Sequence, residues 1–331
     1  DIGIDSTLWN KLTVTADWYH KMTDGILMQL NIPLSTGLNA PYRNAGVVRN
    51  IGWEVSVGYN DKWGDFAFGI TANLSDVHNK IIDMKQQIMT GSNNIIRNQE
   101  GSSINSIYGL HCLGMARDEA EAEWVNMNLP QFGADIKAGD LIYADTNSDG
   151  VVNNDDKRII GCAIPRYTYG LTLNFGWKGL SLSAFFQGVG KADSYLSSSY
   201  VLPCINGGTF RKEHLDRWTP QTPNGKYPRM SYTSEHNRYI SDFWMADASY
   251  LRLKNLQLSY TFPQRWLKRI HLKGLSVFAS AENLFTWTDF YQGYDPEVGY
   301  NASTSSGVQL GDVASNYPQV KTYTFGIELK F

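Results

Sequence analysis

The sequence is poor in charged residues and in cysteine. Asp, Glu, Lys and Arg make up 18% of the 331 residues, against roughly 25% in an ordinary soluble chain. The formal net charge of -3 gives no basic surface, so no nucleic-acid partner is expected. The three cysteines, Cys112, Cys162 and Cys204, are widely spaced and form no CxxC pair. This spacing argues against a zinc site or a disulfide framework and favours three unpaired thiols, with a single disulfide as the open alternative.

Long apolar runs and catalytic motifs are also missing. No stretch of 18 apolar residues exists, so no transmembrane helix is expected, and no charged-then-apolar leader indicates a signal peptide. The sequence has no HExxH, GxSxG or phosphate-loop pattern, and its histidines are scattered. Asp295 and Glu297 in "DPE" are paired carboxylates of the kind that do acid–base work. Because nothing supplies a second catalytic partner, we expect no enzyme.

Alternation of apolar and polar residues is the strongest signal in the sequence, and a period of two is typical of β-strands. In the C-terminal stretch, Tyr323, Phe325, Ile327, Leu329 and Phe331 share one face, and Thr322, Thr324, Gly326, Glu328 and Lys330 share the other. Residues 12–19, 53–59, 66–74 and 169–177 alternate in the same way. The first face suits lipid, and the second, rich in Thr, Ser, Asn and Gly, suits a wet lumen.

The lengths of strands and connections fit a membrane barrel. Several strands read as ten or more residues, against about 5–6 in soluble proteins and about 9–11 for a tilted strand that crosses a bilayer. Four tryptophans are expected at strand ends as an interfacial girdle, namely Trp18, Trp53, Trp63 and Trp177. Tight connections at 60–65 and 176–181 contrast with long polar ones at 27–42, 81–105, 116–160, 191–244 and 289–318. Broken alternation between Leu253 and Leu256 indicates a β-bulge.

These features predict an all-β fold, an antiparallel transmembrane β-barrel with about ten strands in this chain. Two alternatives stay open. One is a soluble carbohydrate-binding β-sandwich, whose strands also alternate but should be shorter and carry more Lys and Glu outside. The other is a self-contained porin-like barrel or adhesin.

The segment "DTNSDGVVNNDD", residues 145–156, has the spacing of a calcium loop. Such loops place oxygen ligands at positions 1, 3, 5, 7, 9 and 12, and glycine at position 6. Gly150 stands at position 6, and the expected ligands are Asp145, Asn147, Asp149, the carbonyl of Val151, Asn153 and Asp156. We expect one Ca2+, or Mg2+ because Asp is shorter than the usual Glu, that staples a long loop. An Asx-rich turn without metal is the alternative.

Two aromatic-rich loop stretches are candidate substrate contacts. They are "SDFWMADASY" at 241–250 and "FYQGY" at 290–294, and rings of this kind stack on sugars or hold peptide side chains. The residues expected in this role are Phe243, Trp244, Tyr291 and Tyr294. Packing within the loops is the alternative.

An ordered set of stretches resembles the C-terminal part of SusC-like (SusC/RagA) TonB-dependent transporters. No single stretch is decisive, but together they cover nearly the whole chain. They are "DWYHKMTDGIL" (17–27), "NAGVVRNIGWEVSVGY" (44–59), "GDLIYADTNSDGVVNNDDKRIIGCAIPRYTYGL" (139–171), "FQGVGKADSY" (186–195), "RWTPQTPNGKYPR" (217–229), "DASYLRLKNLQLSYTFP" (247–263), "AENLFTWTDFYQGYDPEVG" (281–299) and "YPQVKTYTFGIELKF" (317–331).

The resemblance implies a function and a set of partners. Family members have a plug domain, a TonB box and a 22-stranded barrel, so residues 1–331 would be the C-terminal barrel portion, with plug and N-terminal strands outside this chain. The implied function is TonB-dependent import of glycan oligosaccharides or peptides across the outer membrane, together with a SusD-like surface lipoprotein. This chain would supply barrel wall in contact with lipid, and extracellular loops.

The C-terminal strand is expected to close that barrel. The resemblance implies that its aromatic residues, including Tyr323, Phe325 and Phe331, form the segment that the assembly machinery recognises. Unpaired backbone groups in hydrocarbon cost several kcal/mol each, so a barrel has no free edge. Residues 319–331 should therefore pair with 274–286 on one side and with a strand outside this sequence on the other.

Overall fold

The computed structural model describes residues 1–331 apart from 31, 33–34, 36, 91–93, 196–200, 206–209, 269–270, 291–292 and 299–318.

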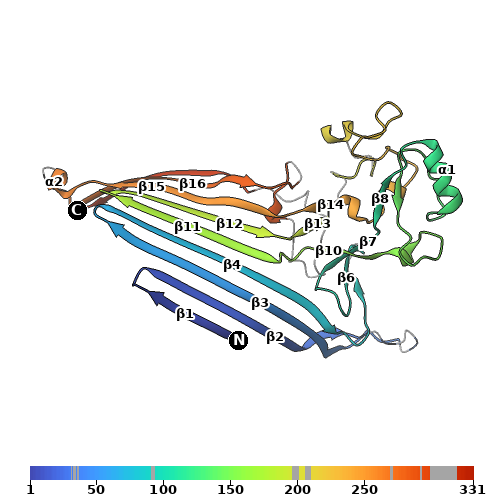
Figure 1. Cartoon of the computed structure of the whole chain (residues 1–331), viewed down its shortest axis with the longest axis horizontal. Helices are drawn as coiled ribbons and strands as arrows, with labels where there is room; N and C mark the ends of the chain where they lie inside the picture. Colours follow the sequence, from blue (N-terminus) through green and yellow to red (C-terminus); the bar gives the residue numbers. More distant parts are fainter. Residues whose placement is uncertain are drawn as a thin grey trace.

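Nine long strands form one antiparallel sheet in the order β1-β2-β3-β4-β11-β12-β15-β16-β17 (Figure 1). Their bounds are β1 Ile2–Leu8, β2 Leu12–Gln29, β3 Tyr42–Trp63, β4 Phe66–Asp83, β11 Tyr167–Trp177, β12 Leu180–Gly190, β15 Tyr250–Thr261, β16 Gly274–Trp287 and β17 Thr322–Lys330. The antiparallel all-β prediction is confirmed, with nine strands in the described sheet where about ten were expected. Because these strands form one sheet, the sandwich of two packed sheets is ruled out.

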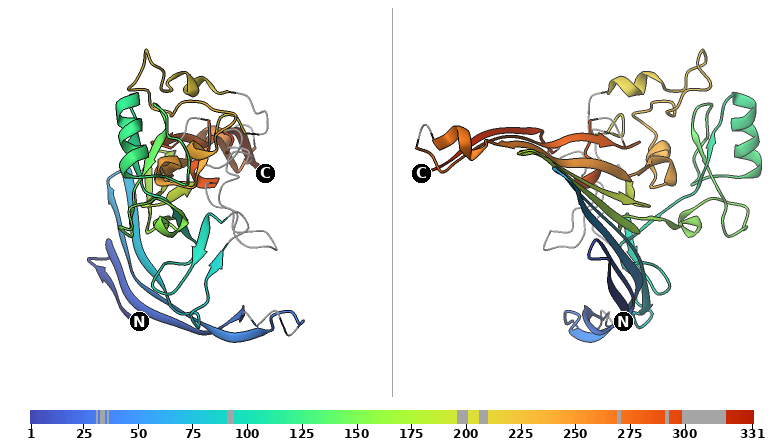
Figure 2. Two further views of the ribbon diagram at one scale, coloured as in Figure 1. Left: turned by 90° about the vertical axis from the view of Figure 1, so that its right-hand side faces the viewer. Right: turned by 60° about the vertical axis from the view of Figure 1, so that its left-hand side comes forward.

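The sheet is curved, and its two edge strands lie apart (Figure 2). Strands β1 and β17 occupy opposite ends of the strand order, and within the described residues they do not pair with each other. The described strands therefore do not close into a small barrel. The pairing expected for the C-terminal strand is confirmed on one side, because Thr322–Lys330 runs antiparallel to Gly274–Glu282.

Tight turns lie at one end of the sheet and long connections at the other (Figure 1). Only residues 64–65 separate β3 from β4, and only 178–179 separate β11 from β12. Gly179 has a φ of +90°, and a Cβ there would lie 2.5 Å from the carbonyl oxygen of Thr261. Only glycine fits this turn without strain. Hence the expected asymmetry of short turns and long loops is present.

The long connections 84–166 and 191–249 fold into a separate body at the far end of the sheet, here called the loop layer (Figures 1 and 2). Its strands are β5 Met89–Thr90, β6 Ile96–Asn98, β7 Ser106–Gly109, β8 Cys112–Met115, β9 Leu141–Tyr143, β10 Arg158–Cys162, β13 Asp193–Tyr195 and β14 Met245–Asp247. Its helical turns are α1 Glu119–Asn128, η2 Asn154–Asp156, η3 Lys212–Leu215, η4 His236–Arg238 and η5 Asp242–Trp244. Two further turns follow it in sequence, α2 Gln264–Leu267 and η7 Pro296–Val298.

The loop layer, rather than the sheet, contains the main apolar core. The largest fully buried side chains include Tyr143, Tyr195, Ile107, Leu110 and Leu141, all of them in the loop layer. Near the tight turns, no second layer of the described residues covers either face of the sheet, and large apolar side chains such as Phe66 and Ile70 are exposed there. The sheet therefore needs other partners for its apolar face, and lipid is one that suits it.

Helix α1 was not anticipated from the sequence. The side chain of Asp118 caps it by accepting a hydrogen bond from the backbone N–H of Glu121, at 2.9 Å. Its only buried residues are Ala122 and Val125. Because so few of its residues are apolar and buried, the sequence shows little apolar periodicity that could have predicted the helix. None of the helices in the described residues is long and apolar enough to span a membrane.

The predicted bulge in β15 is confirmed. The register between β15 and β16 shifts between Leu253 and Asn255, so Lys254 has no partner in the ladder. The opposite neighbour, β12, shifts against β15 at the same level, between Phe185 and Phe186. Arg252, beside the bulge, and Lys254, within it, reach the same loop, as described below.

Candidate functional site

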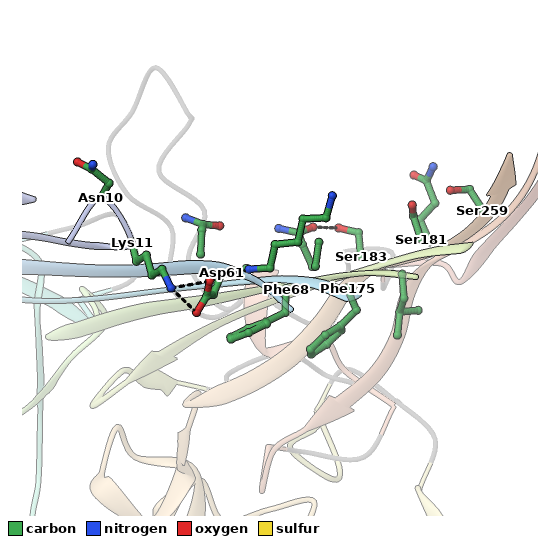
Figure 3. Close-up of a pocket in the computed structure, with 16 residues that line it drawn as sticks. Asn10, Lys11, Asp61, Phe68, Phe175, Ser181, Ser183 and Ser259 are labelled. Atoms are coloured by element: carbon green, nitrogen blue, oxygen red, sulfur yellow. Dashed lines mark hydrogen bonds and ion pairs between the residues drawn. The ribbon is translucent and has the colours of Figure 1, made fainter. Parts of the chain in front are cut away.

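The sheet presents two chemically different faces. Figure 3 shows Phe68 and Phe175 on one side of the ribbon, and Ser181, Ser183 and Ser259 on the other. The register explains the separation, since Phe175 pairs with Phe68 and with Leu182, while Ser183 pairs with Asn174 and Gln257. Residues that face one another across strands therefore share a polarity.

The polar face is hollowed near the tight turns. A cavity of about 810 Å³ there is lined by small polar side chains, among them Asn60, Asn174, Ser183 and Gln257 (Figure 3). The hydroxyl of Ser183 donates to the side-chain oxygen of Asn174 at 2.8 Å. A second hollow of about 580 Å³, lined by Asp17, Glu54, Ser56, Asn73 and Gln187, continues the same face toward the loop layer. Such a surface is suited to water and to polar partners, not to lipid.

The apolar face is bounded by two levels of tryptophan. Trp63 and Trp177 end β3 and β11 beside the tight turns, as expected. Trp18 and Trp53 do not lie at strand ends, which corrects the prediction; they pair with each other in mid-strand. Trp53 precedes Trp63 by ten residues, and ten residues of a strand tilted by about 40° span roughly 25 Å, the height of a barrel's lipid-facing band. The strands are longer than expected because they continue past the level of Trp18 and Trp53, on the side away from the tight turns.

A charged pair lies at the level of Trp18 and Trp53. Asp76 stands across from Trp53 and from Tyr167 in the ladder. Arg166 binds it with both prongs of its guanidinium, with Nε 2.8 Å from Oδ1 and an Nη nitrogen 3.1 Å from Oδ2. A charge on the apolar side would be costly in hydrocarbon, so this pair agrees with the tryptophans on where the apolar band ends.

The loop from Asp145 to Asp156 is ordered by its own side chains. The carboxylate of Asp145 accepts hydrogen bonds from the backbone N–H of Ser148 at 2.6 Å and of Gly150 at 2.8 Å. These bonds, the Gly150 bond foremost, lower the pKa of Asp145 from its ordinary value of 3.8. Asn147 and Asp149 accept in the same way from N–H groups two residues onward. The side chains of Asn147 and Asp149 remain exposed at the turn.

Asp156 closes the loop from inside. It is fully buried, and its oxygens accept from the backbone N–H of Thr146 at 2.7 Å and of Asn153 at 2.8 Å. Oδ1 also accepts from the hydroxyl of Thr146 and from the backbone N–H of Asn147, both at 3.4 Å. Oδ2 accepts one hydrogen bond within the described residues, from Asn153, and so keeps a lone pair for a cation. Within the described residues, no three His, Cys, Asp or Glu side chains are gathered into a metal cluster. The ligand set expected from the sequence depends on amide and carbonyl oxygens as well.

The expected aromatic contacts fall in different surroundings. Trp244 is buried and donates its indole N–H to the carbonyl of Asn237 at 3.0 Å. Phe243 packs edge-on against it, with ring centroids 4.9 Å apart. Trp244 is therefore part of the loop-layer core, which favours loop packing over an open stacking platform. Tyr294 is half-buried and accepts from Arg211 at 2.9 Å, and Tyr291 lies outside the described residues.

The "DPE" carboxylates are held by two cations of β15. Arg252 is almost fully buried and lies 2.6 Å from an oxygen of Asp295 and 2.6 Å from an oxygen of Glu297. Lys254, the bulged residue, lies 2.6 Å from the other oxygen of Glu297. Both carboxylates are therefore engaged in a balanced ion network that fixes a loop on the sheet. Sequence reasoning found the bulge but not this network, since the partners are more than 40 residues apart.

A second buried network was also missed. Asp140 is 1% exposed and lies 2.7 Å from Arg229. It accepts from the side chain of Asn237 at 2.8 Å and from the backbone N–H of Lys137 at 3.0 Å. These residues join three parts of the loop layer. No local sequence pattern announces such a pairing.

Comparisons with known proteins agree with this geometry. A family model described as TonB dependent receptor-like, beta-barrel, matches residues 1–284. The chain is 28% identical over its whole length to TonB-dependent receptor P26 of Formosa agariphila. It is 26% identical, over 99% of its length, to TonB-dependent receptor SusC of Bacteroides thetaiotaomicron. The chain spans about a third of the length of these relatives, 34% and 31% respectively.

Solved structures show the same fold. The chain resembles the RagAB peptide importer in its open-open state with a TM-score of 0.74 and 25% identity, covering 97% of this chain and 33% of that one. A structure of the RagAB peptide transporter matches with a TM-score of 0.76 at 24% identity, covering 97% and 34%.

Proposed function

The chain belongs to the TonB-dependent receptor β-barrel family, and from this premise we propose that it forms part of the wall of an outer-membrane nutrient importer. The observation that carries the proposal is the sheet with one polar and one apolar face, the latter bounded by tryptophans about one bilayer apart. The two open edges must be paired in hydrocarbon. We therefore assign the remaining barrel strands, and a plug over the polar face, to parts of a longer polypeptide outside this sequence.

The partners follow from the same premise. TonB would supply energy through the part of the protein outside this chain. The loop layer would face the cell exterior, where a SusD-like lipoprotein would cap it, because it has its own core and projects beyond the apolar band. The name RagAB belongs to a peptide importer and SusC to a TonB-dependent receptor. The RagAB likeness supports peptides as one proposed substrate class. Glycan oligosaccharides, implied by the resemblance of the sequence to SusC-like transporters, are the second proposed class.

The import proposal is tested in the native host. Deletion of the gene should abolish uptake of a fluorescent member of a peptide and oligosaccharide panel, and a protonophore should abolish the same uptake in the wild type. A lipoprotein should co-purify with the tagged full-length protein. Uptake that continues after deletion, or that ignores the protonophore, contradicts active import.

We also propose that the Asp145–Asp156 loop holds one Ca2+ or Mg2+. Asp145, Asn147 and Asp149 lie around the Gly150 turn, and Val151, Asn153 and Asp156 would complete an all-oxygen set. The cation would neutralise the carboxylates and reinforce a loop that is otherwise held by Asx-type hydrogen bonds and by backbone hydrogen bonds of Val152 with Pro130 and Phe132.

Calorimetry on the chelator-treated full-length protein tests this proposal. Calcium or magnesium should bind with one site in the wild type and fail to bind after Asp149→Ala. The control is Asp155→Ala, an exposed acid of the same loop outside the ligand spacing, which should bind as the wild type does. Absence of binding heat in the wild type, or an equal loss of cation binding in Asp149→Ala and Asp155→Ala, would contradict the metal proposal and favour the metal-free turn.

A further inference from the structure

A cavity in the loop layer, away from the polar face of the sheet, has the composition of a binding site. It is an open hollow of about 460 Å³ built from segment 210–230, a size within the usual range for ligand pockets. Its apolar walls include Phe210, Leu215 and Met230. Phe210 and Leu215 are strongly exposed. Exposed large apolar side chains that gather at a hollow are typical of ligand sites.

One cation in this cavity is left uncompensated. Three arginines line it, but Arg229 pairs with Asp140 at 2.7 Å and Arg211 with Glu213 at 3.2 Å. For Arg217, the described part of the chain offers no carboxylate within ion-pair distance, although it lines the cavity. The adjoining stretch 206–209 contains no acidic residue.

The other polar groups of the lining are already engaged. His214 is buried, accepts from the backbone N–H of Arg211 at 3.1 Å and lies 2.9 Å from the carbonyl of Val201. Burial lowers its pKa from 6.5, so the ring is neutral at pH 7. The hydroxyl of Thr219 is hydrogen-bonded to that of Thr222 at 2.6 Å. Arg217 is thus the one polar group of the lining free to bind a ligand among those described.

The backbone around Arg217 is fixed before any ligand arrives. The N–H of Trp218 donates to the carbonyl of Tyr227 at 2.7 Å, and the Thr222 hydroxyl donates to the carbonyl of Arg217 at 3.1 Å. Gly225 packs so closely that a Cβ there would lie 2.4 Å from the Arg217 backbone. The indole of Trp218 is anchored to the carbonyl of Arg117 at 3.0 Å. A site ordered in advance loses less entropy on binding.

We propose that this cavity binds the C-terminal end of a short peptide whose last residue is apolar. The guanidinium of Arg217 takes the terminal carboxylate, whose planar shape it matches with two parallel hydrogen bonds. Phe210, Leu215 and Met230 cover the apolar side chain. A glycan fits less well, because its many hydroxyls need several free hydrogen-bonding side chains, and this lining offers one. The site is independent of the import proposed above.

Photo-crosslinking on the detergent-solubilised full-length protein tests the assignment. The probe is acetyl-leucyl-photoleucine, as the free acid and as the C-terminal amide, with adducts mapped by mass spectrometry to residues 210–230. We expect the acid to label this segment at least about tenfold more than the amide, since a charge-assisted pair contributes roughly that factor. Arg217→Gln should lower labelling by the acid about tenfold, and Arg217→Lys should recover part of it. The control Lys212→Gln removes an exposed cation of the same segment and should label as the wild type does.

Two results overturn the pairing of Arg217 with the peptide carboxylate. One is equal labelling of residues 210–230 by acid and amide in the wild type, a comparison that needs no variant to fold. The other is a folded Arg217→Gln protein that labels like the wild type. Competition by digalacturonate that exceeds competition by acetyl-leucyl-leucine also overturns the peptide assignment, in favour of an acidic glycan.

Discussion

At the scale of single residues, buried charges in the loop layer decide how far its long segments are fixed. Asp140 is surrounded by donors from three segments, Lys137, Arg229 and Asn237. Next to it, His236 is 3% exposed and its Nε2 lies 2.8 Å from the carbonyl of Leu141. Burial lowers the pKa of His236 from its ordinary 6.5 against the opposing effect of that hydrogen bond. The loop layer is therefore built for a charged Asp140–Arg229 pair beside a neutral His236.

Arg229→Met should destabilise the loop layer by roughly 3–5 kcal/mol, because it leaves the buried carboxylate of Asp140 without its cation. The matched control is Glu235→Gln, an exposed acid that lies 3.7 Å from Arg238 and whose loss should cost less than about 0.5 kcal/mol. Hydrogen exchange of the Leu141 amide, which donates to Asn237, measures the local free energy of opening. Similar free energies of opening for Arg229→Met and Glu235→Gln would mean that the Asp140–Arg229 pair does not stabilise the loop layer by this amount.

Acidification should weaken the same region through His236. Its folded pKa lies below 6.5, so the unfolded state binds the proton more readily. The contribution to stability is complete above pH 6.5 and is lost as the pH falls toward the lower, folded pKa. His236→Gln, which keeps a donor but cannot titrate, should flatten the dependence of Leu141 amide exchange on pH between 7.5 and 5.5. His20→Gln, at an exposed position of β2, serves as the control, and an unchanged slope in His236→Gln would contradict the argument.

At the scale of elements, the bulge in β15 turns a strand into an anchor for a loop. Without the bulge, Leu253 and Leu256, which are three residues apart, would fall on opposite faces of the strand. With it, both leucines keep to one face in the ladder, and Arg252 and Lys254 remain free to bind Asp295 and Glu297. Burial raises the pKa of Asp295, but Arg252 and two backbone N–H groups outweigh this effect and lower it from 3.8.

Arg252→Met should therefore release the Asp295 loop. Its loss leaves a nearly buried carboxylate unpaired, which costs roughly 3–5 kcal/mol. The reporters are the amides of Glu297 and Gln319, which donate to Asp295 at 3.0 and 2.9 Å and should exchange much faster. Lys254→Met should have a smaller effect, because Glu297 keeps its contact with Arg252. Unchanged exchange of both amides in Arg252→Met would show that the loop is held by other contacts.

The two faces of β17 should respond differently to charge. Thr324 and Phe325 are both exposed here, since β17 is an edge strand, so exposure does not identify the lipid face. The register does separate them, because Ile327 pairs with Val277 whereas Thr324 pairs with Ser280. Ile327→Lys should cost roughly 2–4 kcal/mol in a bilayer if this position lies near the midplane, and Thr324→Lys should cost little. Reversible unfolding in lipid vesicles measures both, and equal costs would contradict a lipid-facing Ile327.

At the scale of the whole molecule, the sequence predicted what is periodic and missed what is not. Strands, their faces, the β15 bulge and the β16–β17 pairing were readable because strand geometry repeats every two residues. The loop layer was unreadable because its structure depends on contacts such as Arg229–Asp140, which no local period records. The tryptophans show the boundary between these cases. The face of the sheet on which the tryptophans lie was predictable from the alternation. The extension of the strands beyond Trp53 was not, because the alternating pattern does not change where the apolar band ends.

The final prediction concerns how the sheet is completed. Among the described strands, β17 has one partner, β16, and β1 lies at the other edge of the sheet, yet neither edge can stay unpaired in hydrocarbon. In the full-length protein, with Cys112, Cys162 and Cys204 replaced, cysteines at Ser280 and Thr324 should be joined by a short bifunctional thiol reagent, because these residues are ladder partners. Cysteines at Asp5 and Thr324 should not be joined, since strands outside this sequence should separate them. Efficient cross-linking of 5 to 324 would mean that residues 1–331 close a barrel alone, and the proposed role as part of an importer wall would fall with it.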